Sequence, residues 1–395
     1  MTSNRTPIRR ISPATIAAVT ATLMLGVAAA PDALAVDRIL SSETGNIRVT
    51  THASGLNRPW AIEFLPDGRA LVTEKPGRLR LVGTDGELSP PLAGVPEVDS
   101  RGQGGLLDVT LHPRFGENRL VYLSFSEPGT GSTSSTAVAR GRLNEAGTAI
   151  DDVRIVFSQQ PKVDSTRHFG SRVVFAPDGT MFVTTGDRGD RAYRVQAQDV
   201  GSHLGKVIRL TDDGRVPPDN PFVGRSGARP EIWSYGHRNI QGAAIHPVTG
   251  RLWTIEHGPL GGDEINIPAA GANHGWPVVS HGTEYSGEPV GQGRSNAPGM
   301  ADPIATWTPV IAPGGMTFYT APLFPAWKGN LLIAGLRSAA VVRLTLEGDR
   351  VSTEERLLTE LRRRIRDVAV GPDGAVYAAT DDSDGEILRI APAAR

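Results

Sequence analysis

Short runs of alternating apolar and polar residues, each followed by a tight turn and a second such run, recur along the chain. In VVFAPDGTMFVTT, which begins at Val173, two β-type runs flank a Pro-Asp-Gly turn, where proline presets φ and glycine accepts a positive φ. Related segments are AIEFLPDGRALV from Ala61, DVTLHPRFGENRLVYL from Asp108, GAAIHPVTGRLWTI from Gly242, MTFYTAPLFPAWKGNLLIAGL from Met316 and DVAVGPDGAVYAAT from Asp367. Six hairpins of this kind predict an all-β protein built from repeated units.

The spacing of the hairpins indicates the architecture. They begin at intervals of roughly 47 to 73 residues, whereas a four-stranded propeller blade needs about 40–50. The excess is expected in loops, and the longest inserts surround residues 187–240 and 256–315, which are rich in Gly, Pro, His and charge. Residues 36–395 are therefore predicted to form a single six-bladed β-propeller that opens with a polar strand at 36–50 and carries functional loops on one face. A pair of β-sandwiches explains the recurrence poorly.

The first 35 residues have a different pattern, typical of an export signal. Arg5, Arg9 and Arg10 precede the apolar run IAAVTATLMLGVAAA, and Ala33-Leu34-Ala35 fits a small-x-small cleavage site. Residues 1–35 are predicted to be a signal peptide, which makes the mature protein periplasmic or secreted, with no membrane span after cleavage. The alternative of an uncleaved anchor helix is weakened by the shortness of the run, and a twin-arginine signal remains open.

Charge and cysteine content exclude several classes of function. The formal net charge is −1, which favours neither nucleic acid nor an anionic membrane as a partner. The chain has no cysteine, so it contains no disulfide, no thiolate nucleophile and no Cys-ligated metal centre. Metal sites built from oxygen ligands or histidine remain possible.

One histidine and one aspartate flank the same hairpin. His168 precedes its first strand and Asp187 follows its second, so their side chains can approach closely. A histidine suits a general base near neutral pH, and a carboxylate can fix its tautomer and stabilise its cation. Each residue alone has a simpler explanation, since a lone histidine is usually a satisfied polar group and Asp187 can cap a turn.

Further polar residues lie at strand ends beside the hairpins. Arg238, Arg364 and Arg366 offer planar donor forks suited to carboxylates on a ligand, while Gln103, Asn239 and Gln241 add neutral hydrogen bonds. HGPLGGDE, from His257, combines backbone carbonyls with two carboxylates, which suits Ca²⁺ although it matches no EF-hand loop. Together these residues describe a pocket for a ligand with several carboxylates, a hard cation and a base.

At these residues the chain resembles the soluble pyrroloquinoline quinone (PQQ)-dependent sugar dehydrogenases, the glucose/sorbosone dehydrogenase group, and within it the aldose sugar dehydrogenase branch. The resemblance spans about residues 50–392. It rests on motifs that occur in the family's order: GLNRPWAIEFLPDG, GQGGLLDVTLHP, the HFGSR–PDG–GD segment, EIWSYGHRNIQG, EHGPLGGDEIN, NHGWP and RIRDVAVGPDG.

The resemblance implies a six-bladed propeller with the quinone in a cleft of its top face, oxidation of aldoses at the anomeric carbon to lactones, and reoxidation of the cofactor by an external electron acceptor. It implies that His168 is the base, that Asp187 orients it and that Arg238 stabilises developing charge. The cofactor contacts implied are Gln103, Arg238, Asn239, Tyr285, Ala312, Gly314, Arg337, Arg364 and Arg366. The calcium ligands implied are backbone carbonyls of Gly258 and Pro259, and, at a second site, Glu264 with a main-chain carbonyl near His274.

Two alternatives use the same residues differently. A calcium-dependent lactonase would hold its metal in the central channel through side-chain carboxylates, and Asp263 and Glu264 are a thin supply. A secreted propeller that only binds carbohydrate or protein would need no base. Six tryptophans are expected mostly in packing roles.

Overall fold

The computed structural model describes residues 1–2 and 35–394. The predicted signal peptide lies almost wholly outside these residues, so that assignment stays a prediction. Within the described residues no helix is long and apolar enough to cross a bilayer. Residues from Val36 onward form one compact unit.

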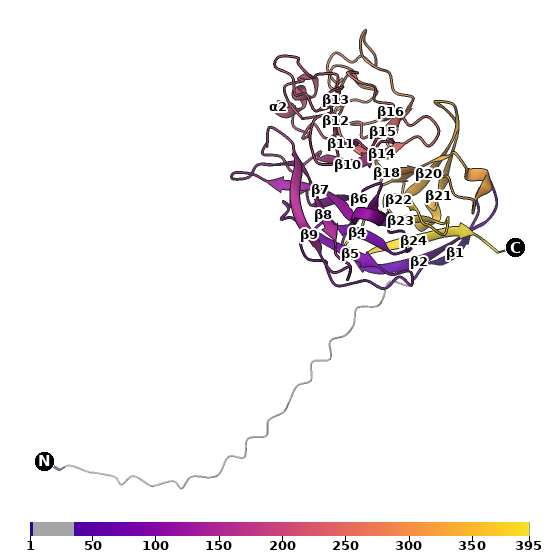
Figure 1. Cartoon of the computed structure of the whole chain (residues 1–395). Coiled ribbons are helices and arrows are strands. Elements are labelled where there is room, and N and C mark those ends of the chain that lie inside the picture. Colours follow the sequence, from indigo (N-terminus) through magenta and orange to yellow (C-terminus); the bar gives the residue numbers. More distant parts are fainter. Residues whose placement is uncertain (3–34, 395) are drawn as a thin grey trace, which may run out of the picture. The chain divides into compact units, whose positions relative to one another are not determined.

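This unit consists of six antiparallel sheets arranged around a centre (Figure 1). From the innermost strand outward, the first three sheets are β3 (Pro59–Phe64), β4 (Ala70–Glu74) and β5 (Arg78–Val82); β6 (Leu106–Leu111), β7 (Leu120–Pro128), β8 (Ser134–Leu143) and β9 (Ile150–Ser158); and β10 (Gly170–Phe175), β11 (Met181–Thr185), β12 (Lys206–Leu210) and β13 (Ile232–Tyr235). The fourth and fifth are β14 (Ile240–Ile245), β15 (Leu252–Glu256), β16 (Asp263–Asn266) and β17 (Ala305–Trp307); and β18 (Pro313–Phe318), β19 (Leu331–Gly335), β20 (Ala340–Glu347) and β21 (Arg350–Leu357).

The sixth sheet joins both ends of the compact unit. Its order is β22 (Ile365–Val370), β23 (Val376–Thr380), β24 (Gly385–Pro392), β2 (Ile47–Leu56) and β1 (Asp37–Leu40). Ile47 therefore pairs with Pro392, and the polar strand expected at 36–50 is in fact two strands. The innermost strands contact one another in a closed ring, β3–β6–β10–β14–β18–β22, which confirms the six-bladed propeller. The six predicted hairpins begin on these six strands.

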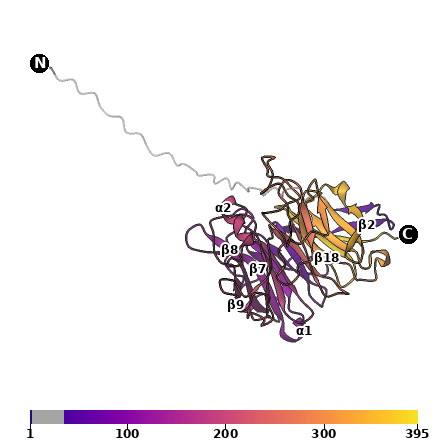
Figure 2. The ribbon, with the colours of Figure 1, turned by 90° about the horizontal axis from the view of Figure 1, so that it is seen from above.

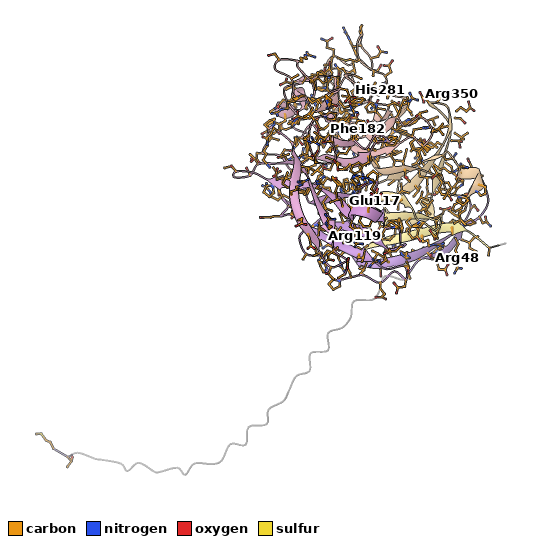
Figure 3. All side chains as sticks on the ribbon, viewed as in Figure 1. Arg48, Glu117, Arg119, Phe182, His281 and Arg350 are labelled. Carbon is orange, nitrogen blue, oxygen red and sulfur yellow. The ribbon has the colours of Figure 1, made fainter. Side chains whose placement is uncertain are left out.

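Apolar side chains fill the space between neighbouring sheets, because alternate residues of each strand face the adjoining blade. Phe182 lies within this packing, whereas Arg48 and Arg350 lie at the periphery (Figure 3). The short helices α1 (Phe115–Asn118) and α2 (Arg191–Arg194) lie on opposite faces (Figure 2). Within residues 35–394, three single-turn 3₁₀ helices occur in loops: η1 (Val195–Gln198), η2 (Pro325–Trp327) and η3 (Thr359–Leu361).

A register shift recurs at the same place in all six blades. The pairing of each innermost strand with its neighbour slips near the start of the innermost strand. Such bulges redirect side chains. The residues at these shifts include Trp60, Leu107, Gln241 and Arg366, from four blades, which line a common cavity, and Arg172, which lines a second cavity.

Candidate functional site

His168 and Asp187 are in direct contact, as their positions at the two ends of one hairpin predicted. Nδ1 of His168 lies 2.6 Å from Oδ1 of Asp187, and both side chains are buried. Oδ1 also accepts the N–H of Gly189 at 2.8 Å. His168 has a φ of 48°, and its own N–H donates to Oε1 of Gln103 at 2.8 Å, which anchors this left-handed residue.

The electrostatics of this pair favour a neutral imidazole. Burial lowers the pKa of His168, Arg238 lowers it further, and Asp187 opposes both. Burial alone would raise the pKa of Asp187, but His168, Arg238 and the N–H of Gly189 act together in the opposite direction, so that this pKa is lowered. With its Nδ1 proton directed at Asp187, His168 has a free Nε2 lone pair that can accept a proton.

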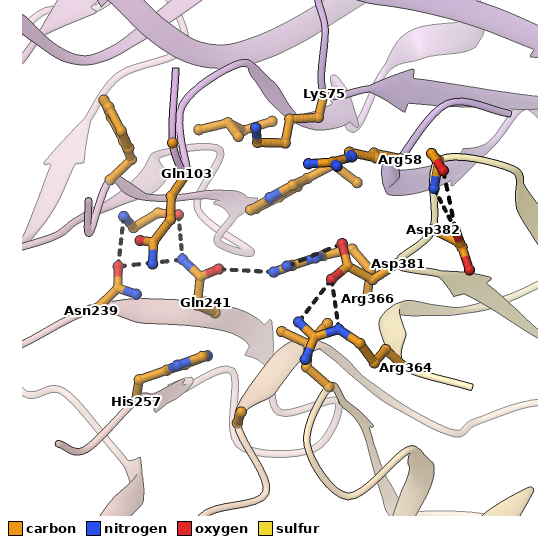
Figure 4. A pocket seen from close by; sticks show the side chains of 18 residues that line it. Arg58, Lys75, Gln103, Asn239, Gln241, His257, Arg364, Arg366, Asp381 and Asp382 are labelled. Atoms are coloured by element: carbon orange, nitrogen blue, oxygen red, sulfur yellow. Dashed lines mark hydrogen bonds and ion pairs between the residues drawn. The ribbon is translucent and has the colours of Figure 1, made fainter. Parts of the chain in front are cut away.

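A cavity of about 440 Å³ opens beside this pair (Figure 4). Its lining includes four cationic side chains and two aspartates, and the full set is Arg58, Trp60, Lys75, Gly102, Gln103, Leu107, Phe169, Gly170, Asn239, Gln241, His257, Ala312, Leu336, Arg364, Arg366, Asp381, Asp382 and Ser383. His168 does not line this cavity, although its neighbours Phe169 and Gly170 do. The excess of positive charge suits an anionic ligand.

Asp381 holds two of the cations side by side. Its Oδ2 accepts Nε and Nη2 of Arg364 at 3.0 and 2.8 Å, and its Oδ1 lies 3.4 Å from Nη2 of Arg366. Nε of Arg366 is buried without a hydrogen-bond partner in the described part of the chain. The predicted pair of arginines is therefore assembled by an aspartate that sequence reasoning missed.

Three amides form the opposite side of the cavity (Figure 4). Asn239 accepts the N–H of Gly170 at 3.1 Å, Gln241 donates to the carbonyl of Gly170 at 3.1 Å, and Gln103 accepts the N–H of His168. His257 completes the wall; it lies 2.6 Å from the carbonyl of Pro313, and burial lowers its pKa to about 3, so it stays neutral.

The remaining predicted cofactor contacts lie around this cavity. Arg238 donates to the carbonyl of His257 at 3.0 Å and reaches the hydroxyl of the exposed Tyr285 at 3.5 Å. Arg337 and Tyr285 line a neighbouring groove that shares His257, Ala312 and Arg364 with the cavity. Gly314 packs against the backbone of Arg366, where a Cβ would come within 2.1 Å of the carbonyl oxygen.

The predicted calcium ligands gather in a turn and a small adjoining cavity. Gly258, Pro259, Glu264 and His274 all line it. Asp263 fixes the turn, since its carboxylate accepts the N–H groups of Gly258 at 2.9 Å and of Ala312 at 2.7 Å. Asp263 is thus a structural acceptor here.

Several atoms near this turn lack partners within residues 35–394. No hydrogen bond ends on the carbonyl oxygens of Gly258 or Pro259, and both ring nitrogens of His274 and Oδ1 of Asn266 are buried and unpaired. Burial, with Glu256 nearby, raises the pKa of Glu264 to about 8. No cluster of three or more His, Asp or Glu side chains is arranged to hold a metal in this part of the chain, so a metal here would depend on carbonyl oxygens.

A buried ion cluster centred on Arg172 connects residues of several blades at the central channel. Arg172 donates to Asp108 and to Asp367 at 2.8 Å each, and its Nε donates to the carbonyl of Gln241 at 2.8 Å. The guanidinium lies 4.3 Å from the ring centre of Trp60. These contacts connect five of the six blades with one buried cation.

Comparison with known proteins places this geometry among related chains. The profile described as Glucose / Sorbosone dehydrogenase matches residues 56–389. Aldose sugar dehydrogenase YliI of Escherichia coli is 45% identical over 339 residues, covering 85% of this chain and 91% of that protein. The apo crystal structure of the soluble E. coli aldose sugar dehydrogenase superposes with a TM-score of 0.85 at 44% identity, covering 88% of this chain and 100% of that one. The PQQ-bound aldose sugar dehydrogenase of Streptomyces coelicolor has a TM-score of 0.72 at 30% identity, covering 92% of this chain and 99% of that one.

Proposed function

The chain belongs to the glucose/sorbosone dehydrogenase family and is an oxidoreductase acting on sugars; from this we propose that it oxidises aldoses at the anomeric carbon to lactones, with PQQ as cofactor and Ca²⁺ as metal. The observation that carries the proposal is the buried His168–Asp187 pair beside a cavity rich in arginine and lysine. A base and an anion-binding cavity are the two things that such a reaction requires of the protein.

The cavity fits a planar ligand with three carboxylates. Arg58, Lys75, Arg364 and Arg366 supply positive charge, and the unpaired Nε of Arg366 is a donor that a bound carboxylate would satisfy. Gln103, Asn239 and Gln241 would meet neutral oxygens. Trp60, Leu107, Phe169 and Leu336 add apolar surface to this lining.

The turn at Gly258 and Pro259 fits a calcium ion. Its two carbonyl oxygens accept no hydrogen bond in the described residues, and Ca²⁺ prefers oxygen ligands of this kind. Glu264 and the unpaired Oδ1 of Asn266 are further oxygens nearby, which would serve a second ion. The rings of His274 and His237 stack 4.5 Å apart, which holds the His274 ring in place.

Each residue of the pair then has a distinct role. Nε2 of His168 accepts the proton of the anomeric hydroxyl as the hydride leaves the same carbon, and Asp187 stabilises the imidazolium that results. Arg238, fixed by the carbonyl of His257, places positive charge where negative charge develops. When bound, PQQ would supply the hydride acceptor, and Ca²⁺ would polarise the quinone so that it accepts the hydride. The two electrons would then pass from the cofactor to an external acceptor.

Sugar oxidation is expected only when both PQQ and Ca²⁺ are added to the purified protein. The measurement is dye-linked oxidation of several aldoses with each addition alone and with both. Binding to the folded state alone also stabilises it, by about 2.7 kcal/mol at a hundredfold excess over Kd, so the unfolding temperature rises. Activity without quinone, or neither activity nor a thermal shift with both additions, would refute the proposal.

Arg366→Gln is expected to weaken PQQ binding by about 10- to 100-fold, because a charge-assisted hydrogen bond contributes roughly 1.5–3 kcal/mol. Calorimetric titration of the protein with PQQ measures the effect. Arg350→Gln is the matched control, since Arg350 is exposed and pairs with Glu347 at the periphery. Unchanged PQQ affinity in Arg366→Gln would remove Arg366 from the cofactor site.

The ion pairs in the central channel argue against the lactonase alternative. Such an enzyme needs carboxylates free to hold a metal there, but Arg172 engages both Asp108 and Asp367. Hydrolysis of lactones without added quinone would favour that alternative, and we expect none.

A further inference from the structure

Trp276 contacts the carboxylate that supports the base. Its indole N–H donates to Oδ2 of Asp187 at 2.7 Å, while Oδ1 is taken by His168 and the N–H of Gly189. Both oxygens of Asp187 are therefore engaged, by donors from three separate segments. Trp276 lies in the insert between β16 and β17, 89 residues from Asp187 in sequence.

The position of the indole is fixed from several sides. The backbone N–H of Trp276 donates to the carbonyl of Gly236 at 2.9 Å, and its carbonyl accepts Nε2 of Gln198 at 2.8 Å. The guanidinium groups of Arg238 and Arg194 lie 5.2 and 5.5 Å from the ring centre. Packing alone does not require the indole N–H to point at a buried carboxylate. A buried carboxylate, in contrast, requires hydrogen-bond donors, and this N–H supplies one.

The hydrogen bond has two physical effects on the pair. It prevents rotation of the Asp187 carboxylate, which keeps the Nδ1 proton of His168 in place and leaves Nε2 free. It also withdraws negative charge from Asp187, so that the carboxylate stabilises the imidazolium less. The other charged or titratable groups acting on His168 are Arg238, Arg188 and His257.

We propose that Trp276 is a positioning residue for the base: its indole N–H holds Asp187 in the orientation, and with the reduced basicity, that keeps His168 neutral and ready to accept a proton. This inference rests on the proposed role of His168 as the base. It assigns to the tryptophan of the NHGWP motif a part in the chemistry beyond packing.

Trp276→Phe tests the proposal, because it removes the N–H and retains an aromatic ring. Without the donor, Asp187 becomes a stronger partner for the imidazolium and the pKa of His168 rises. The acid limb of kcat/KM then moves to higher pH, with a loss of about tenfold at pH 6 that largely recovers at pH 8.5. Trp307→Phe is the matched control, since Trp307 is equally buried and donates to Glu354 at 2.7 Å on the outermost strand of its blade.

The second measurement needs neither cofactor nor sugar. In the whole chain labelled with ¹⁵N-tryptophan, one of six indole signals should titrate together with the His168 ring and lose this titration in His168→Gln. In Trp276→Phe the His168 titration should shift to higher pH, while in Trp307→Phe it should not. The wild-type indole experiment applies even if Trp276→Phe does not fold.

The outcomes separate this inference from the proposed function. No indole signal that follows His168, or an unshifted His168 titration in a folded Trp276→Phe protein, overturns the role of Trp276, even if activity falls. An NMR result as expected in a protein that oxidises no sugar would support the contact and refute the proposed function instead.

Discussion

His168→Gln lowers kcat for sugar oxidation by roughly 10²–10⁴-fold, the usual contribution of a general base, while PQQ affinity stays within about twofold of wild type. Glutamine retains a polar side chain beside Asp187 but has no lone pair basic enough to accept the proton. The measurement is dye-linked activity at saturating PQQ, Ca²⁺ and sugar. A folded variant with full activity would refute the mechanism.

His203→Gln is the matched control for this substitution. His203 is also a buried histidine on the same blade, and its Nε2 lies 2.5 Å from Oε1 of Glu231. Its replacement removes a histidine–carboxylate pair of the same kind away from the cavity. We expect reduced stability with kcat unchanged within about twofold, which separates a loss of catalysis from a loss of packing.

The pH profile gives a second readout for His168. Burial and Arg238 lower its pKa from the ordinary 6.5, so the base form persists below that pH and the acid limb of kcat/KM lies on the acid side of 6.5. Protonation of His168 abolishes activity as the pH falls through its folded-state pKa. In His168→Gln the residual activity should lose this limb.

Arg172→Met is expected to lower the free energy of unfolding by about 3–5 kcal/mol, because it leaves the carboxylates of Asp108 and Asp367 buried without their cation. Burial already raises the pKa of Asp108 to about 6, and that of Asp367 is also raised. Without Arg172 both values rise further above those of the unfolded chain. A buried carboxyl group without a cation destabilises the fold least when it is protonated. The loss of unfolding free energy in Arg172→Met should therefore be larger at pH 8 than at pH 5. Urea unfolding of the cofactor-free protein at both pH values measures it.

Arg209→Met provides the comparison. Arg209 is as buried as Arg172 and also contacts two aspartates, Asp178 and Asp219, at 2.8 and 2.9 Å, but both of these are exposed. Water can solvate them once the arginine is gone, so we expect a loss of about 1 kcal/mol or less. Equal losses in the two variants would contradict the role assigned to the buried cluster.

The periodic hairpins and the His168–Asp187 contact were predictable from sequence because both depend on residues close together in the chain. Alternation and turn residues define each innermost strand, and one hairpin brings His168 and Asp187 together. Strands β16 and β17 have four and three residues, too few for alternation to distinguish them from the long insert expected at 256–315. The sequence likewise predicts one strand where the structure has the two strands β1 and β2.

Contacts between blades were not predictable in this way. Asp381, which contacts Arg364 and Arg366, follows β23, and Trp276, which reaches Asp187, lies in the insert between β16 and β17, so no local pattern predicts either contact. Arg172 stood inside a recognised motif, yet its partners Asp108 and Asp367 lie 64 and 195 residues away. Arg172, Asp108 and Arg366 lie at the register shifts near the start of their innermost strands, so the recurring bulge is the feature that brings these three side chains to the channel.

The sixth sheet, in which β2 pairs with β24, also determines how the protein unfolds. In an open repeat array each unit contacts only its neighbours, so the ends can fray one repeat at a time. Here the first and last blades are neighbours, and the sheet that joins the two ends of the compact unit is completed only by strand β24, Gly385–Pro392. A chain that stops before Gly385 would lose closure of the whole ring as well as one strand, and loss of any blade exposes two faces at once. Unfolding of the propeller is therefore expected to be a single cooperative event.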